Sequence, residues 1–204
     1  MKVAFYTLGC KVNQYETDVM RSAFEEKGYV TSCDDETADI FIINSCTVTS
    51  VADKKSRQKL RHFKRNNPDS IVVLTGCYSQ VYIDEAEAIE EADIILGTKD
   101  RAKLPEIVEN YLNDRIRIIA IKPNVKDEKF ENMLCSSFYE KTRAFIKIQD
   151  GCNRFCSYCA IPLARGRVRS KPLCELEKEL TLIANNGYKE IVLVGINLAC
   201  YGQD

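Results

Sequence analysis

The sequence predicts an α/β protein in which a doubly wound parallel sheet domain over residues 1–121 is followed by a smaller α/β unit over residues 143–204. Short apolar runs, such as residues 39–44 (DIFIIN) and 70–75 (SIVVLT), alternate with segments of helical periodicity. These runs are apolar at nearly every position, which is typical of parallel strands with helices on both faces. Residues 122–142 are polar and charged without a steady period, so they are predicted to form a linker.

The elements follow from the same periodicity, taken along the chain. In the first domain, strands are predicted at residues 2–8, 39–44, 70–75, 93–96 and 115–121. Helices are predicted at residues 15–27, 51–65, 84–91 and 104–113, the first of them stopped by Gly28. The second unit has a strand at residues 143–149, a helix at 174–185 and a strand at 190–194, which together form one βαβ unit.

Composition and charge limit the classes of function. The chain is 45% hydrophobic and 29% charged with a net charge of −1, which indicates a globular protein without a global field toward nucleic acid. The amino-terminal apolar run is too short for a signal peptide, and no run approaches the roughly 18 residues that span a membrane. We therefore expect a cytoplasmic protein without a membrane partner, whose ten cysteines are reduced and available for metal binding or chemistry.

Three cysteines each follow a predicted strand of the parallel sheet. Cys10 follows VAFYTLG, Cys46 follows IFIINS and Cys77 follows IVVLTG. The carboxyl ends of parallel strands share one edge, where open α/β folds place their ligands, so these thiols are expected to meet there. The alternative is that each is a buried small hydrophobe, the usual role of a free cysteine. Three such placements favour a three-thiolate metal site, whereas the remaining isolated cysteines are expected to be structural: Cys33, Cys135, Cys174 and Cys200.

A second set of three cysteines lies in the segment GCNRFCSYCA at residues 151–160. Cys152, Cys156 and Cys159 have the spacing CxxxCxxC, with no fourth cysteine close by. A structural zinc site closes with four ligands, and the only histidine, His62, lies in a charged helix. Iron–sulfur electron carriers use four cysteines, one per iron, so three cysteines on a four-iron cluster leave one iron free to bind a small molecule.

The segment CNRFCSYC resembles the CxxxCxxC motif of the radical S-adenosylmethionine enzymes, including the aromatic Tyr158. The resemblance implies that residues 143–204 are the truncated start of a radical S-adenosylmethionine (β/α) barrel. It also implies a [4Fe–4S] cluster that binds S-adenosylmethionine and generates a 5′-deoxyadenosyl radical, chemistry that belongs to the cofactor. By the same resemblance Tyr158, Gly195 and Asn197 are expected to contact this cofactor, although Gly195 and Asn197 also fit an ordinary turn.

Three further segments resemble the amino-terminal domain of the methylthiotransferases: TLGCKVNQYET, INSCTVTSVADKKSRQ and TGCYSQ. By this resemblance Cys10, Cys46 and Cys77 bind an auxiliary [4Fe–4S] cluster that holds the sulfur to be inserted. The Lys-Val-Asn after the first cysteine resembles the branch that acts on N6-threonylcarbamoyladenosine beside the tRNA anticodon. The implied activity is insertion of a methylthio group at C2 of that adenosine, with an external electron donor and sulfur source. No acid–base catalytic residue is expected, because the C2 hydrogen is unactivated.

Two basic segments fit a polyanionic RNA substrate. Residues 53–65 carry seven Lys or Arg against one acid, and a second group follows the second cysteine set: Arg165, Arg167, Arg169 and Lys171. The alternative is that such a charge run is only a solvated face.

The chain stops after the second strand of the implied barrel. The resemblance therefore implies an amino-terminal portion of a longer enzyme, inactive alone and with an unpaired sheet edge. Two alternatives stay open: the same chemistry on another tRNA adenosine or on a ribosomal protein, and a non-catalytic iron–sulfur carrier fragment. The oligomeric state is not predicted.

Overall fold

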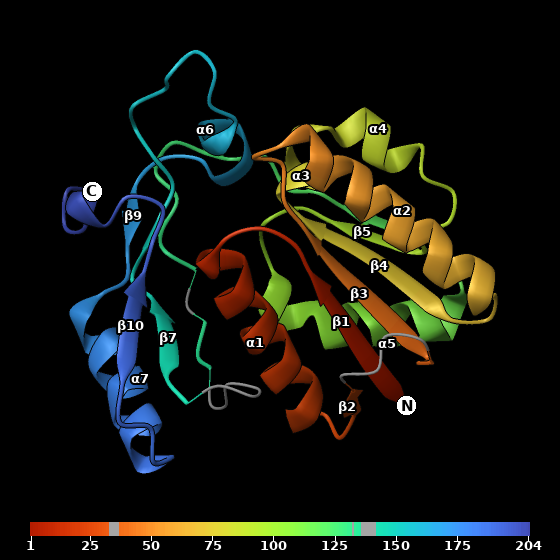
Figure 1. Ribbon diagram of the computed structural model, residues 1–204, viewed down its shortest axis with the longest axis horizontal. Coiled ribbons are helices and arrows are strands. Elements are labelled where there is room, and N and C mark those ends of the chain that lie inside the picture. Colours follow the sequence, from red (N-terminus) through yellow and green to blue (C-terminus); the bar gives the residue numbers. More distant parts are fainter. Residues whose placement is uncertain (33–36, 132, 136–141) are drawn as a thin grey trace.

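The computed structural model describes residues 1–32, 37–131, 133–135 and 142–204 (Figure 1). Its main feature is a six-stranded sheet of order β2-β1-β3-β4-β5-β6, in which every neighbouring pair is parallel. The strands are β1 (Lys2–Thr7), β2 (Val30–Ser32), β3 (Ile40–Ser45), β4 (Ile71–Gly76), β5 (Ile94–Leu96) and β6 (Ile118–Ala120). The helices between them are α1 (Lys11–Glu26), α2 (Ser50–Asn66), α3 (Cys77–Val81), α4 (Ile83–Glu87), the 3₁₀ helix η1 (Arg101–Lys103) and α5 (Leu104–Asp114).

Helices cover both faces of this sheet, as the continuously apolar strands predict. On one face, Leu60 and Phe63 of α2 pack on alternate residues of β3 and β4, together with side chains of α3 and α4. On the other face, Met20 and Phe24 of α1 and Leu104 of α5 pack on the intervening strand residues. The predicted doubly wound parallel sheet is therefore confirmed.

A second core joins this domain to the rest of the chain. It is built by β7 (Ala144–Lys147), α7 (Leu173–Asn185) and β10 (Ile191–Val194), with β7 and β10 parallel as predicted for a βαβ unit. Val12, Tyr15 and Val19, on the side of α1 that faces away from the sheet, pack into this core. Met133 and Cys135 from the predicted linker are buried there too. Helix α1 consequently lies between the sheet and the second part of the chain (Figure 1).

Several short elements were not predicted. They are the edge strand β2, the antiparallel pair of β8 (Gln149–Asp150) and β9 (Arg169–Ser170), helix α6 (Ile161–Arg165) and the 3₁₀ helix η2 (Leu198–Cys200). Helix α1 begins at Lys11 rather than at residue 15, so it starts directly after Cys10. The helix predicted at 84–91 is the shorter α4, and it is preceded by a helix that was not predicted, α3, which begins at Cys77. Both corrections place a cysteine of the first set at the start of a helix.

The cysteines expected to be structural have different surroundings. Cys135 is buried, Cys174 is exposed and Cys200 is partly buried, while Cys33 lies outside the described residues. None of the helices in the described part of the chain combines the length and the hydrophobicity that a membrane span requires.

Candidate metal centres

The turns that hold Cys10, Cys46 and Cys77 lie at one edge of the sheet. Their strands β1, β3 and β4 are direct neighbours, and Ser45 at the end of β3 pairs with Gly76 at the end of β4. Cys46 and Cys77 each follow directly after this pair. Strands β1 and β3 flank the point where the strand order reverses, which is where open α/β sheets bind ligands. The topology thus brings the three turns together, and their role as metal ligands stays a prediction.

A glycine sets the spacing between the first two cysteine turns. Gly9 has a φ of +103°, and a Cβ atom built on it would lie 2.7 Å from both Cβ and Sγ of Cys46. Only glycine tolerates this backbone conformation together with so close an approach. The residue before Cys10 therefore lies directly against Cys46. Cys10 is exposed, whereas Cys46 and Cys77 are buried.

Asn13 and Ser45 hold the three turns together by hydrogen bonds. The side-chain amide of Asn13 donates to the carbonyl oxygens of Leu8 and Ser45, both at 2.9 Å. The thiol of Cys10 lies 3.7 Å from the Asn13 Oδ1 atom. The hydroxyl of Ser45 donates to the Thr75 carbonyl at 2.6 Å and accepts the backbone N–H at the start of α3 at 3.2 Å. Each cysteine turn is therefore tied to its neighbour.

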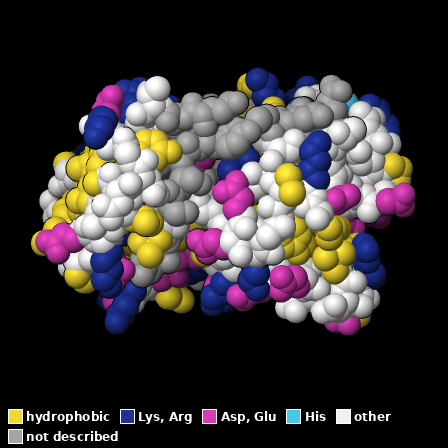
Figure 2. Space-filling view, turned by 90° about the horizontal axis from the view of Figure 1, so that it is seen from below, with side chains coloured by type: hydrophobic (Ala, Val, Ile, Leu, Met, Phe, Trp, Pro, Cys, Tyr) yellow, Lys and Arg dark blue, Asp and Glu magenta, His cyan; other side chains and the backbone are white. Residues whose placement is uncertain are grey.

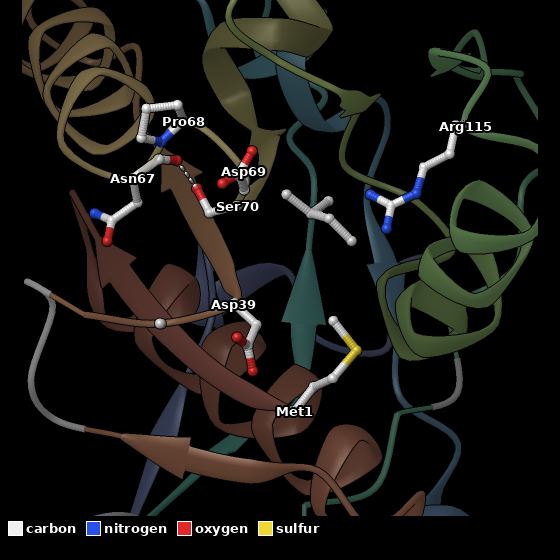
Figure 3. Close-up of a pocket in the computed structure, with 9 residues that line it drawn as sticks. Met1, Asp39, Asn67, Pro68, Asp69, Ser70 and Arg115 are labelled. Atoms are coloured by element: carbon white, nitrogen blue, oxygen red, sulfur yellow. Dashed lines mark hydrogen bonds between the residues drawn. The ribbon is translucent and has the colours of Figure 1, made fainter.

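A cavity of about 410 Å³ lies over Cys10 and Cys46. Its wall includes the apolar Val48 and Val51 and one basic residue, Lys55, near the start of α2. A second hollow, of about 280 Å³, lies at the opposite, amino-terminal edge of the sheet and is lined by no cysteine (Figure 3). Of these two hollows, only the one at the carboxyl edge combines thiols with space for a bound molecule.

The second cysteine set lies in the loop between β8 and α6. The backbone N–H of Cys152 donates to the carbonyl of Gly166 at 3.0 Å, and that of Cys159 donates to the carbonyl of Cys156 at 2.9 Å. These bonds fold the loop back on itself, with Cys152 and Cys159 partly buried and Cys156 exposed. Tyr158, predicted to contact the cofactor, is 90% exposed and therefore available to a bound molecule.

No three Cys, His, Asp or Glu side chains among the described residues converge as the ligands of a single metal ion do. A four-iron cluster takes one cysteine per iron, so its cysteines surround the cluster and do not meet at one point. The loop and the sheet edge therefore differ from the geometry of a mononuclear zinc site.

Gln149, which sequence analysis did not single out, connects the cysteine loop to the end of β10. Its side-chain amide donates to the carbonyls of Asp150 and Gly151 at 2.7 and 2.8 Å, and its Oε1 atom accepts the backbone N–H of Asn197 at 2.7 Å. A Cβ atom on Gly195 would lie 3.0 Å from the Cβ atom of Gln149. The structure thus places Gly195 and Asn197, which follow β10, beside Gln149 at the start of the cysteine loop, and their cofactor contacts stay a prediction.

A buried group of charges, also missed from the sequence, lies between the two cysteine sets. Glu16 of α1 is fully buried and accepts hydrogen bonds from Lys147 at 2.7 Å and from both terminal nitrogens of Arg165 at 2.8 and 2.9 Å. Arg101 forms a third ion pair with Glu16. Asp150 lies 2.6 Å from Lys147 and 3.2 Å from Arg165. These residues come from both parts of the chain, so no local pattern reveals them.

The cations of this group strongly favour the ionised forms of the Glu16 and Asp150 carboxyls. Burial raises the pKa of Glu16, but its three cationic neighbours outweigh burial and hold the pKa well below the usual 4.5. Burial likewise opposes ionisation of Asp150, yet Lys147 and Arg165 lower its pKa from 3.8 to about 2. A third carboxyl near these cations, that of Glu131, has a raised pKa because burial dominates there.

The group fits an anionic cluster at the sheet edge. Glu16 and Asp150 form ion pairs with Arg101, Lys147 and Arg165. In the described part of the chain, Nε of Arg165 and Nε and Nη2 of Arg101 are buried without a hydrogen-bond partner, while Nη1 of Arg101 pairs with Glu16. Burial raises the pKa of the Cys77 thiol, and the positive charges of Arg165 and Arg101 partly offset this. A metal-bound thiolate at Cys77 would place its negative charge near these cations.

The basic segment after the second cysteine set is not the surface that the sequence suggested. Arg165, Arg169 and Lys171 are all buried. Arg169 pairs with Glu128, and Lys171 pairs with Glu179, so these charges are used inside the protein. The expected RNA-binding patch at this position is therefore wrong for these three residues.

The basic helix α2 is also partly neutralised. Three of its basic side chains form ion pairs with acidic residues at 3.8, 3.3 and 2.9 Å: Arg57, Arg61 and Lys64. Lys54 and Lys55, near the start of the helix, are exposed and have no ion pair within the described residues. Basic and acidic side chains are interspersed on the face seen in Figure 2. The first turns of α2 thus keep an exposed basic surface, from which Lys55 lines the cavity over Cys10 and Cys46.

The fold defines the class of protein: it is shared with a solved radical S-adenosylmethionine enzyme. The chain resembles the solved radical S-adenosylmethionine methyltransferase TsrM from Kitasatospora setae, determined with tryptophan and a cofactor analogue bound. The TM-score is 0.58 at 12% identity, over 96% of this chain and 47% of that one. At this identity the similarity shows the fold alone.

Sequence comparison narrows the class. Residues 2–97 match the model of the family described as Uncharacterized protein family UPF0004. The chain is 45% identical to the threonylcarbamoyladenosine tRNA methylthiotransferase MtaB of Bacillus subtilis, over 99% of this chain and 45% of that protein. The MtaB of Aquifex aeolicus is 42% identical, over 100% of this chain and 50% of that protein. A tRNA-2-methylthio-N(6)-dimethylallyladenosine synthase of Staphylococcus haemolyticus is 33% identical, over 97% of this chain and 39% of that protein.

The chain spans about half the length of the curated relatives it matches. Along nearly all of its own length it resembles the tRNA methylthiotransferases, and within them the threonylcarbamoyladenosine branch. The resemblance inferred from the motifs is confirmed.

Proposed function

We propose that this protein is an iron–sulfur radical S-adenosylmethionine enzyme that inserts a methylthio group at C2 of N6-threonylcarbamoyladenosine next to the tRNA anticodon. One observation supports this most strongly: two three-cysteine sets, at the sheet edge and in the loop before α6, are joined by one buried charge network. Neither set has a fourth thiolate nearby in the sequence, and several relatives are named for this activity.

In this proposal the cysteines of residues 151–160 hold one four-iron cluster and those at the sheet edge hold the other. When bound, the first cluster and S-adenosylmethionine supply the radical that removes the C2 hydrogen, which no acid or base of the chain could remove. The chain's own residues position these groups. Gln149 fixes the cysteine loop against the backbone of Asn197, and the absent side chain of Gly195 leaves that contact room. The exposed Tyr158 is available to the cofactor's adenine.

The tRNA substrate is assigned to the sheet-edge side of the molecule. The cavity over Cys10 and Cys46 is open and partly apolar, which suits a nucleobase. Lys55 lines it and its exposed neighbour Lys54 precedes it in α2, and both can contact phosphate oxygens, which position an RNA without reading its sequence. We further propose a cytoplasmic enzyme that takes electrons and sulfur from external donors.

Nucleoside analysis of tRNA tests this function. Because the chain spans about half of its relatives, it replaces the matched half of the Bacillus subtilis relative, and the hybrid is expressed in a strain lacking its own threonylcarbamoyladenosine methylthiotransferase. Liquid chromatography with mass spectrometry is expected to show the 2-methylthio form of threonylcarbamoyladenosine. A Cys152→Ala hybrid is the control and is expected to show none.

The same chromatogram decides between the alternatives. If the methylthio group appears only on dimethylallyladenosine, the chain belongs to the other tRNA branch, to which it is also related. If neither nucleoside changes while the intact Bacillus subtilis enzyme restores the modification, the tRNA function is contradicted. The remaining hypotheses would then be modification of a ribosomal protein and a role as a non-catalytic iron–sulfur carrier.

A further inference from the structure

The buried charge network contains a direct link between the two cysteine sets. Arg165 is the last residue of α6, the helix that begins two residues after Cys159. Its Nη2 atom donates a 2.6 Å hydrogen bond to Oδ1 of Asn13, which lies three residues after Cys10. Both side chains are 1% exposed, so water does not compete for this bond.

On the side of the first set, Asn13 controls two cysteine turns at once. Its amide donates to the carbonyls of Leu8 and Ser45, the second of which immediately precedes Cys46. A displacement of Asn13 therefore moves the backbone before both Cys10 and Cys46. The side chain has no freedom to shift, because all of its polar atoms are engaged.

On the side of the second set, Arg165 is held as firmly. Its guanidinium forms a two-pronged pair with Glu16 and lies 3.2 Å from Asp150. Gly166, the next residue, accepts the backbone N–H of Cys152. A guanidinium can satisfy Glu16 and Asn13 together because it is planar with several fixed donors, whereas a lysine ammonium presents a single charged centre.

We propose that Arg165 and Asn13 are positioning residues that fix the distance and orientation between the two metal centres. The inference rests on the proposed function in that both centres hold clusters. Transfer of a sulfur group from one centre to a carbon activated at the other requires close placement of the reactants, and displacements of about 1 Å can cost a hundredfold in rate. A buried, doubly anchored arginine supplies that placement at a point between the two sites.

Hydrogen exchange on the metal-free chain tests the link without any cluster. For Arg165→Lys, the exchange rate is measured in the first domain, at the amide of Leu8, which donates to the Asn44 carbonyl at 3.0 Å. For Asn13→Ala, the exchange rate is measured in the second part of the chain, at the amide of Cys152. Each amide is expected to exchange about tenfold faster, which corresponds to about 1.4 kcal/mol.

Arg117→Lys is the matched control. Arg117 donates to three backbone carbonyls at 2.7 to 2.9 Å, all within the first domain. Its replacement is expected to leave the amides of Leu8 and Cys152 unchanged. If Arg165→Lys does not fold, the Cys152 amide in Asn13→Ala decides alone. Unchanged exchange at the reporter amides of the folded variants would overturn the proposed link.

A spectroscopic measurement on the reconstituted chain separates positioning from folding. In the wild type with both clusters reduced, electron paramagnetic resonance is expected to show a magnetic interaction between the two centres. Arg165→Lys and Asn13→Ala are expected to keep the iron content but to weaken or broaden that interaction. An unchanged interaction in both variants would contradict the positioning role. Wild-type protein that binds a single cluster would contradict the proposed function instead, and the metal-free exchange result would still decide whether the link exists.

Discussion

Replacement of Glu16 by glutamine is predicted to be among the most destabilising single changes in the chain. Among the described residues, Glu16 is the only carboxylate that forms ion pairs with all three of Arg101, Lys147 and Arg165, and it is fully buried. Removing one member of a buried charge group leaves the others uncompensated and costs about 3–5 kcal/mol. That is a large part of the roughly 5–15 kcal/mol by which a domain is stable.

Urea unfolding of the metal-free protein, followed by far-ultraviolet circular dichroism, measures this effect. At a slope of about 2 kcal/mol per molar urea, the unfolding midpoint of Glu16→Gln should fall by roughly 2 M. Glu109→Gln is the control, since that carboxylate lies 3.6 Å from Lys27 with both side chains more than 40% exposed. An exposed pair of this kind contributes less than about 1 kcal/mol. Equal shifts in the two variants would refute the role assigned to the buried network.

Two further predictions follow from the same sites. In the folded protein the pKa of Asp150 is about 2 and that of Glu16 is well below 4.5. Both pKa values lie below those of an unfolded chain, which are about 4. Ionisation of the two carboxyls therefore stabilises the fold above about pH 4. That contribution is lost as the pH falls toward 2, so the urea midpoint should drop between pH 5 and pH 3, and an unchanged midpoint would contradict it. Gly9→Ala, whose Cβ would lie 2.7 Å from Cys46 Sγ, is expected to lose the iron of the first site after anaerobic reconstitution. Gly28→Ala, with a similar φ of +82° but no atom within 4 Å of the added Cβ, should keep it, and equal iron in both variants would argue against the tight turn.

The central strands could be predicted because their signal is local. Strands β3 and β4 are buried at every position, and this is visible as uninterrupted apolar runs. Strand β2 has only three residues and an exposed Val30, so it carries no such run and was missed. Helix α6 is five residues long and too short for a periodic pattern. The placement of three cysteines after strands predicted that their turns meet at one edge of the sheet, since parallel topology alone brings the strand ends together.

The buried charges could not be predicted because their partners are distant in the sequence. Glu16 and Arg165 are 149 positions apart, and Arg165 stands in a run of basic residues that reads as a solvated face. Burial reverses that interpretation: the same arginine is an internal cation, whereas Lys54 and Lys55 of α2 are exposed. Gln149 escaped notice for the same reason, because its partner Asn197 lies 48 positions later.

The iron content of two triple-alanine variants tests most directly whether each cysteine set binds its own cluster. After anaerobic reconstitution the wild type should hold about eight irons, and each variant, lacking either Cys10, Cys46 and Cys77 or the three cysteines of residues 151–160, should hold about four. Added S-adenosylmethionine should change the spectrum of only the variant that keeps the second set. A wild type with about four irons, and no loss when Cys10, Cys46 and Cys77 are replaced, would show that the sheet edge binds no cluster.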